Sequence, residues 1–434
     1  MSDAAPAAES SEWHRLHPLS PVIRAGRALA GIVLLFGGTL FNSAQSGRGG
    51  FLSHIVGAVL LVLLGVVSWL VTRWCVRDGV LRIETGLIRR QSLRFPLTQI
   101  QAIDTVRPGL ARIFGLAELR LRMGGSAGNS GRLAYLRAAE AEALRTQLLA
   151  LARGSGAAPV ANTETILISV PTGRLIASIA LSLPAMVIVV AVVAFVITRL
   201  VAPAAATAVL GSSGAAGLGV VTMVWRRFNS GYRLTVADAP DGLRVRSGLI
   251  ETAAETIPSG RVQAVRMVEP LLWRPFGWCR MEVDVAGRHR REGENSAESR
   301  QLRAVLPVGT TAEAGRLLAR IVPDAPLDRD RPPDRVRFKS PLRFHYLAFG
   351  RNQTCAVSTT GRLARVTSWV PLAKVQSLRW VQGPLQRRLR LATIHLDTAG
   401  RSVHAALTDR DAGEADRLLD ELTLQCRAAR RALT

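Results

Sequence analysis

The sequence predicts a mixed fold: four transmembrane helices in two hairpins, combined with three small β-barrel domains that are each capped by a C-terminal helix. Three observations predict it. Four long apolar runs interrupt the chain of 434 residues. One nine-residue phrase occurs three times, and an amphipathic segment follows each occurrence. The membrane part and the repeated part are therefore derived separately below.

The repeated phrase reads FPLTQIQAI at 95–103, IPSGRVQAV at 257–265 and VPLAKVQSL at 370–378. The unequal intervals indicate a repeated domain, because a solenoid would space its copies evenly. Each copy has a glycine ten residues before its proline, an arginine sixteen residues after it and a glycine twenty-nine residues after it. The landmarks, copy by copy, are Gly86, Pro96, Arg112 and Gly125; Gly248, Pro258, Arg274 and Gly287; and Gly361, Pro371, Arg387 and Gly400.

Each copy reads as short antiparallel strands followed by one helix. Stretches such as LRLRM, MEVDV and TIHLD alternate with period two and lead into a glycine-bearing turn. The proline fits the first residue of a strand or an edge, because it cannot donate to a ladder. Helical segments with one apolar face follow at 138–152, 311–322 and 411–426. A barrel of antiparallel strands plugged by a helix satisfies this order.

The apolar runs cover about 28–44, 51–72, 175–198 and 200–225. Each is close to the ~20 residues that cross a ~30 Å hydrocarbon core. The first run could instead be a cleaved signal peptide. It starts late, lacks a small-residue cleavage site and is followed at once by a second apolar run, so a hairpin is favoured.

Arginines set the expected orientation of both hairpins. Several flank the outer ends of the runs, whereas each tight turn carries only one, and the positive-inside rule therefore places both termini and all three repeats in the cytoplasm. The flanking arginines are Arg24, Arg27, Arg73, Arg77, Arg174, Arg226 and Arg227, and those in the turns are Arg48 and Arg199. The expected location is the cell inner membrane, crossed several times.

The formal net charge is +24, and only two of the 56 basic residues are lysines. This arginine bias is typical of a GC-rich genome, and the remaining signal suits a basic body beside an anionic leaflet. Nucleic-acid binding is not expected, because there is no zinc finger, RNP-type motif or basic zipper. The cysteines Cys75, Cys279, Cys355 and Cys426 have no metal-ligand spacing, so we expect reduced thiols, no metal and no cofactor.

No catalytic motif is present: the sequence has no GxSxG, HExxH or Walker loop, and we expect no catalytic residues and no enzyme. The spans also hold no ionisable group near the midplane, which a transporter would need. Gly211, Ala215 and Gly219 give one small-residue face on the fourth run, which suits packing among the four helices or a homodimer contact.

The arginines Arg112, Arg274 and Arg387 have two interpretations. Each could contact an anion or a lipid headgroup at a barrel rim. Alternatively, each could satisfy backbone carbonyls and hold the geometry of the repeat, and the second interpretation is favoured because all copies share one fold. We therefore expect the whole set of repeat landmarks to be structural.

The stretch DGVLRIETGLIRRQSLRFPLTQIQAIDTVRPGLARIFGLAELRL at 78–121 resembles the bacterial pleckstrin-homology-like (PH-like) domain of the YdbS-like family. The second copy keeps the Gly-Leu-Ile at 248–250 and the Arg-Pro-Phe-Gly at 274–277. The third is degenerate, with Gly-Arg-Leu at 361–363 and no Phe-Gly turn. The resemblance implies a seven-stranded half-open barrel capped by a helix, an assembly or binding role, and no catalytic residues.

The predicted organisation is a tail, two membrane hairpins, three domains and two linkers. The ranges are 1–20 for the tail, 21–73 for hairpin 1, 74–153 for domain 1, 154–173 for a linker, 174–226 for hairpin 2, 227–322 for domain 2, 323–340 for a linker and 341–428 for the degenerate domain 3. Domain 3 could dock on the others or swing on its linker.

The sequence thus predicts a non-enzymatic, membrane-anchored scaffold protein. Its expected partners are the lipid bilayer and either another membrane protein or a second copy of itself. The alternative is a component that binds anionic lipid headgroups or is associated with transport.

Overall fold

A computed structural model provides the three-dimensional description of the chain. It describes residues 13–23, 63, 66–67, 69–77, 79–86, 90–123, 131–152, 164–201, 219–239, 242–250, 252–285, 303–326, 328–400, 403 and 405–432. These residues form two compact units, which are described separately. Unit 1 is Met1–Thr163 with Ile250–Thr256, and unit 2 is Glu164–Leu249 with Ile257–Thr434.

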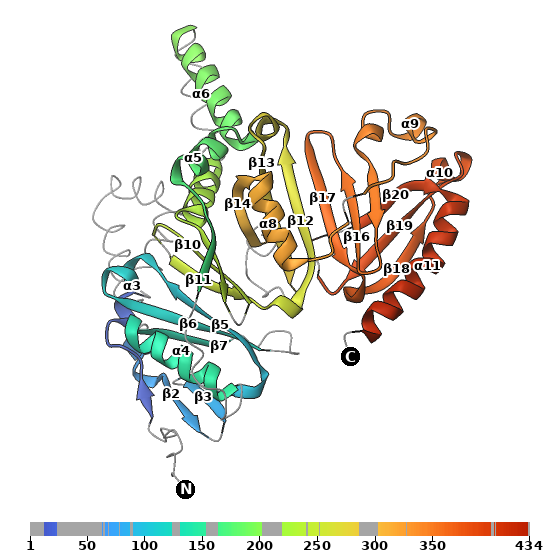
Figure 1. Cartoon of the computed structure of the whole chain (residues 1–434). Helices are drawn as coiled ribbons and strands as arrows, with labels where there is room; N and C mark the ends of the chain where they lie inside the picture. Colours follow the sequence, from blue (N-terminus) through green and yellow to red (C-terminus); the bar gives the residue numbers. More distant parts are fainter. Residues whose placement is uncertain are drawn as a thin grey trace. The chain divides into compact units, whose positions relative to one another are not determined.

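The three repeats share one order of elements (Figure 1). Repeat 1 consists of β1 (His14–Arg15), β2 (Arg73–Arg77), β3 (Val80–Thr85), β4 (Gln91–Pro96), η1 (Leu97–Gln99), β5 (Ile100–Arg107), α3 (Gly109–Ile113), β6 (Leu116–Met123), β7 (Gly131–Arg137) and α4 (Ala138–Ala152). Repeat 2 consists of β8 (Thr165–Ser169), α5 (Thr172–Ala180), α6 (Leu183–Val201), β9 (Thr235–Ala239), β10 (Gly242–Ser247), β11 (Thr252–Ile257), η2 (Ser259–Arg261), β12 (Val262–Pro270), η3 (Leu271–Phe276), β13 (Trp278–Val285), β14 (Arg303–Thr310) and α8 (Thr311–Ile321).

Repeat 3 has the same plan from its second strand on, and its described residues have neither a counterpart of the strands β1 and β8 nor apolar helices near the start. It consists of α9 (Val336–Lys339), η4 (Phe344–Tyr346), β15 (Ala348–Arg351), β16 (Cys355–Thr360), β17 (Ala364–Pro371), η5 (Leu372–Lys374), β18 (Val375–Val381), α10 (Pro384–Arg388), β19 (Leu391–Thr398), β20 (Ala405–Asp411) and α11 (Ala412–Arg431). The three helical segments expected from the sequence are confirmed as α4, α8 and α11.

A β-bulge explains why each repeat keeps a glutamine in its phrase. The ladder between β5 and β6 skips Gln101, that between β12 and β13 skips Gln263, and that between β18 and β19 skips Gln376. All three stand five residues after the motif proline. A bulge bends its strand and increases the twist, so the same residue bends the same strand in every copy.

Proline and glycine fix the turns on either side of this phrase. Contrary to the expectation, the prolines do not open a strand: Pro96 and Pro371 end β4 and β17, and all three motif prolines precede a short 3₁₀ turn with φ near −60°. Proline suits this place because its ring fixes that φ value. The glycines ten residues earlier have φ between +95° and +119°, a region that favours glycine.

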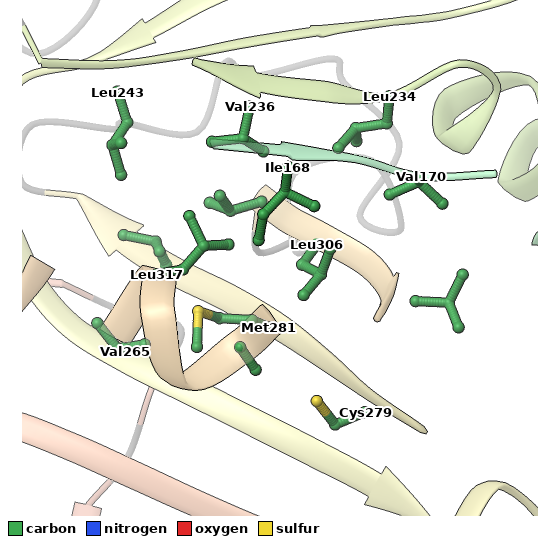
Figure 2. Packing of buried hydrophobic residues seen from close by; sticks show 14 of the residues in the cluster. Ile168, Val170, Leu234, Val236, Leu243, Val265, Cys279, Met281, Leu306 and Leu317 are labelled. Carbon is green, nitrogen blue, oxygen red and sulfur yellow. The ribbon is translucent and has the colours of Figure 1, made fainter. Parts of the chain in front are cut away.

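Each C-terminal helix covers the three-stranded sheet that precedes it (Figure 1). In repeat 1 the buried helix residues Leu144 and Leu148 join the core beneath β5 and β6. In repeat 3 the corresponding residues are Leu418 and Leu422. Figure 2 shows the core of unit 2, where Leu317 of α8 packs with Met281 and Val265 of the sheet. One apolar face of each helix is therefore buried, as its pattern predicts.

The expectation of a barrel for each repeat is corrected by the strand order. Strands β1-β2-β3-β4 form an open sheet, and β18-β19-β20 form another. The sheet of β7-β6-β5 in unit 1 continues into β11, which belongs to repeat 2, and the sheet of β14-β13-β12 in unit 2 continues into β17 of repeat 3. None of the four described sheets closes into a barrel, and two of them run from one repeat into the next.

The prediction of four membrane helices is corrected in part. Among the described residues one helix, α6, is long and apolar enough to cross a membrane, and its residues are not buried. The expected span 175–198 is divided, because α5 ends at Ala180 and its Leu175 and Ile179 belong to the core of unit 2. The expected span 28–44, most of 51–72 and residues 202–218 of the fourth lie outside the described residues.

Both apolar pairs stand between the first and second strands of a repeat. The runs at 28–44 and 51–72 lie between β1 and β2, and α6 with the helical residues 219–231 lies between β8 and β9. The segment 154–173, expected as a linker, contains β8. In 323–340, Asp330 pairs with Phe349 and Val336 of α9 is fully buried.

The turn before β17 supplies a test of the glycine position. A Cβ on Gly361 would lie 2.1 Å from the carbonyl oxygen of Ala364, and the residue has φ +95°. We therefore expect Gly361→Ala to lower the free energy of unfolding by about 1–3 kcal/mol. Denaturant unfolding of the full-length protein in detergent measures this value. Gly260→Ala is the control, because its Cβ would meet open space, and equal effects of the two changes would contradict the assignment.

Candidate binding surfaces

Repeats 2 and 3 are joined by direct pairing of β12 with β17. The ladder runs from Val265 opposite Trp369 to Pro270 opposite Ala364. Glu269 and Arg365 are opposite each other in it and form an ion pair of 3.5 Å. Both faces of this sheet are buried at the joint. The hydrophobic core of repeat 2 includes Trp369 of β17, and the hydrophobic core of repeat 3 includes Ala264 of β12. Repeat 3 is therefore docked on repeat 2.

Loops on both sides reinforce this joint. The amide of Leu271 donates to the carbonyl of Leu363 at 2.7 Å, and the Lys374 ammonium donates to the carbonyl of Gly260 at 2.9 Å. The landmark Gly400 leaves room for a carboxylate of repeat 2, since a Cβ there would lie 2.3 Å from Oδ2 of Asp284.

Repeat 2 makes the equivalent joint with repeat 1 inside unit 1. Strand β11 pairs with β5, with Thr252 opposite Arg107 and Ala254 opposite Thr105. Where the ladder stops, the buried carboxylate of Asp104 accepts a hydrogen bond of 3.2 Å from the amide of Thr256. In both joints the strand that leads into the motif proline of one repeat thus pairs with the strand that follows the motif proline in the preceding repeat.

The two joints have the same register. Counted from the proline of its own repeat, Val265 is at +7 and pairs with Trp369 at −2, while Thr105 at +9 pairs with Ala254 at −4. In both joints the two offsets add to +5. One pairing rule therefore connects all three repeats, although their side chains in these strands differ.

The same strands are unpaired at the two ends of the array. Within the described part of the chain β4 pairs with β3 alone, and β18 pairs with β19 alone. The described residues of β11 and β12 are buried or partly buried, whereas residues 91–94 of β4 are exposed, and in β18 Trp380 and Val381 are 37% and 39% exposed. Such open edges are sites at which another strand can add.

A second surface is formed by the turns that carry the Phe-Gly pair. In repeat 1 Ile113 and Phe114 are 77% and 49% exposed, and in repeat 2 Leu271 and Phe276 are 49% and 55% exposed. The next residue has φ +67° at Gly115 and +62° at Gly277, where glycine is favoured. We call these two turns the apolar tips.

The apolar tips lie at the bases of the apolar runs. In unit 1, Ile23 is buried against Ala111 of α3, and it lies five residues before the start of the first run at position 28. In unit 2, Arg227 follows the fourth run and its guanidinium lies 5.6 Å from the ring centroid of Trp273 in η3. The same turn of repeat 3 has Arg388 and Leu389 in place of the tip, followed by Arg390 at φ +51°.

The three landmark arginines stand at the ends of these turns. The carbonyls of Arg112, Arg274 and Arg387 accept the amide of the residue three positions later, at 3.0–3.1 Å, and this bond closes the turn in every copy. The side chain of Arg274 also donates to the carbonyl of Arg362 at 2.8 Å and lies 5.8 Å from the ring centroid of Tyr346. The described contacts of this side chain are therefore to the protein.

An arginine-lined pocket opens in unit 1 at the end of the second apolar run. Its volume is about 420 Å³, and its lining includes Val71, Arg15, Arg73, Arg90 and Glu84. Arg73 is paired with Glu84 at 2.8 Å. Among the described residues, Arg15 and Arg90 have no acidic partner. The pocket therefore suits an anionic group, and it could not be predicted from the sequence because its residues come from separate strands.

The buried cysteine thiols are unreactive as nucleophiles near neutral pH. Burial raises the pKa of Cys279 and of Cys355 to about 12, so both are neutral thiols near pH 7. Burial, helped by nearby Arg280, lowers the pKa of Arg227 to about 10, which leaves it cationic. In the part of the chain that the structure describes, no cluster of His, Cys, Asp or Glu could hold a metal ion.

Most of the remaining predicted positions lie outside the residues that the structure describes. Gly125, Gly287, Gly211 and Ala215 lie outside the described residues, so the predicted helix-packing face is represented by Gly219 alone, where a Cβ would meet open space. Sequence reasoning missed the two joints, the pocket and the exposure of the apolar tips. The Phe-Gly pair itself was the one visible signal.

Comparison with known proteins identifies the repeats. A family model described as Bacterial PH domain matches residues 23–152, 165–321 and 342–425, well over half of the chain. Each matched segment covers most of one repeat, and the first two also contain the apolar runs. No curated protein and no solved structure gives a significant match.

Proposed function

The chain belongs to the bacterial PH domain family, and on this premise we propose that it is a non-enzymatic, membrane-anchored scaffold. Its three PH-like repeats mediate protein assembly at the inner face of the cell membrane. The apolar runs hold it there as two helical hairpins, with both termini in the cytoplasm. The partner is another membrane protein or a second copy of the chain.

One observation carries the membrane part of this proposal: apolar tips occur in the two repeats that contain apolar runs. Ile113 and Phe276 are exposed beside the segments that would enter the bilayer. Repeat 3 has no apolar run, and its turn has the charged Arg388 at the position of Ile113. Exposed apolar side chains at these places suit the membrane interface, where their burial contributes to binding.

The assembly part of the proposal rests on the way in which the repeats pair with one another. PH-like domains here pair with one another through backbone ladders, a mode that depends little on side-chain identity. An array of such modules offers strand edges and helices rather than a reaction centre. Its positive charge of +24 also favours an anionic leaflet.

Cysteine labelling tests the membrane face. Ile113→Cys and Phe276→Cys should react with a water-soluble maleimide at least about tenfold more slowly than Leu385→Cys, because the bilayer interface shields the tips. Leu385 is a matched control, since it lies in the same turn of repeat 3 and is 50% exposed. The full-length protein is labelled in inverted membrane vesicles. Equal rates at the three positions would contradict the assignment of the tips.

Photo-crosslinking in intact cells tests the assembly role. A benzophenone amino acid at Ile166 on β8 or Leu424 on α11 should give light-dependent adducts that contain another membrane polypeptide. Both side chains are exposed and lie outside β4 and β18. Ile197 of α6 is the control and should yield lipid adducts. Absence of protein adducts at both test positions would overturn the scaffold proposal.

A second candidate function is binding of anionic lipid headgroups, and the arginine-lined pocket favours it. The pocket adjoins the end of an apolar run, and Arg15 and Arg90 are free of acidic partners among the described residues. A headgroup phosphate would therefore meet two available guanidinium groups close to the membrane.

Binding of a short-chain phosphatidylglycerol to the full-length protein in detergent tests this candidate. Arg90→Gln should weaken binding about fivefold, corresponding to ~1 kcal/mol for one arginine. Arg316→Gln, on the exposed face of α8, should leave it unchanged. An unchanged affinity in Arg90→Gln, or equal binding of short-chain phosphatidylcholine, would remove this candidate.

A further inference from the structure

Among the edge strands of the described sheets, β4 and β18 are the complementary halves of the joint that the chain uses twice internally. Strand β18 of repeat 3 corresponds to β5 and β12, each of which pairs with the strand that leads into the motif proline of the next repeat. Strand β4 of repeat 1 corresponds to β11 and β17, which pair with the preceding repeat. No repeat follows β18 or precedes β4 in the described chain.

The shared register predicts which residues would be opposite each other. With offsets that add to +5, Leu378 pairs with Arg94, Arg379 with Leu93, Trp380 with Ser92 and Val381 with Gln91. These pairs are equivalent to the β12–β17 pairs from Val265 opposite Trp369 to Val268 opposite Val366.

The side chains are compatible with this register. Arg379 and Arg94 would fall on opposite faces of the new ladder, because adjacent residues of a strand alternate between faces. Like charges are therefore not placed directly opposite, which would be destabilising. Arg379 also has a carboxylate partner within its own repeat, Asp397, at 3.5 Å.

Exposure at β18 favours a strand partner as well. Val265 and Trp369, which pair in the internal joint, are 0% and 3% exposed. Trp380 and Val381 of β18 are exposed, although their strand ends with the sequence LRWV, whose β-branched and aromatic residues suit a paired strand. An open apolar edge of this kind is normally covered in natural proteins.

We infer that β18 of one chain pairs with β4 of a second copy, in the register of the internal joints. This inference deepens the proposed scaffold role and rests on it, since it names the second copy as an assembly partner. The contact is heterologous, because the two copies contribute different strands. Each added copy leaves one β4 and one β18 edge open, so the contact extends into a row or closes into a ring.

Disulfide trapping tests the pairing and its register. Two full-length chains with different tags are produced together, one with Leu93→Cys and the other with Arg379→Cys. Directly opposite residues have Cα atoms about 4.5–5.5 Å apart, within the range that a disulfide bridges. The expected product after mild oxidation of native membranes is a disulfide that joins the two tags. The native cysteines are buried and should not contribute.

The matched control replaces Arg379→Cys with Gln376→Cys. This position is out of register by three residues, about 10 Å along the strand, and should give at least about tenfold less product. Equal yields from the two combinations, or no product joining the tags, would overturn the inference. An oxidised monomer of the Leu93→Cys/Arg379→Cys double variant, without intermolecular product, would show closure within one chain and would also overturn it.

A charged edge provides a second measurement that needs no disulfide. Wild-type protein in mild detergent should have a mass above that of one 46.7 kDa chain. Trp380→Lys should lower it to one chain, because a lysine on an open edge opposes strand addition. Leu424→Lys, an exposed position on α11, should leave the mass unchanged.

The scaffold role and the pairing of β18 with β4 of a second copy can be contradicted independently. If no chain-to-chain disulfide forms but Ile166 and Leu424 still give adducts with another membrane protein, the scaffold role stands and the self-pairing is wrong. A monomeric mass for the wild-type protein would likewise contradict self-pairing alone.

Discussion

Backbone N–H and C=O groups at the edge of a β-sheet need hydrogen-bond partners, and this requirement organises the repeats. Each repeat has two open sheets, so it cannot satisfy all of its edges alone. In both internal joints the next repeat supplies the missing strand, in the same register. Because backbone groups are the same in every residue, the joint persists although one ladder has Ala253 and Ala254 where the other has Val366 and Thr367.

The same requirement explains the structural role of the nine-residue phrase that occurs in every repeat. The joint can repeat only if the strand after the motif proline has the same bend in every copy, and the bulge at Gln101, Gln263 and Gln376 provides that bend. The proline stands at the end of the strand that pairs with the preceding repeat, and the positive-φ glycine lies in the turn that leads into that strand. The phrase therefore specifies the two strands of the joint and the turn between them.

Much of the repeat could be predicted from the sequence because its signals are local. Period-two strands, an amphipathic helix and glycine turns depend on neighbouring residues, and they identified α4, α8 and α11. The joints could not be found in this way, because β5 and β11 are more than a hundred residues apart in the chain. Strand β8 was missed because apolar runs separate it from β9. Hydropathy alone also merged α5 with α6, although Leu175 is buried in a protein core and α6 is exposed.

The differences among the repeats indicate a division of roles. Repeats 1 and 2 have apolar runs and apolar tips, whereas repeat 3 has neither and instead has Arg388 and Arg390 in the corresponding turn. If tips served only to close the turn, repeat 3 would need one too, yet Arg390 closes its turn at a similar positive φ. The apolar side chains of the tips are therefore not required by the fold. The proposed membrane contact of repeats 1 and 2 would account for their presence, and repeat 3, which lacks the apolar runs, would then offer β18 to a protein strand.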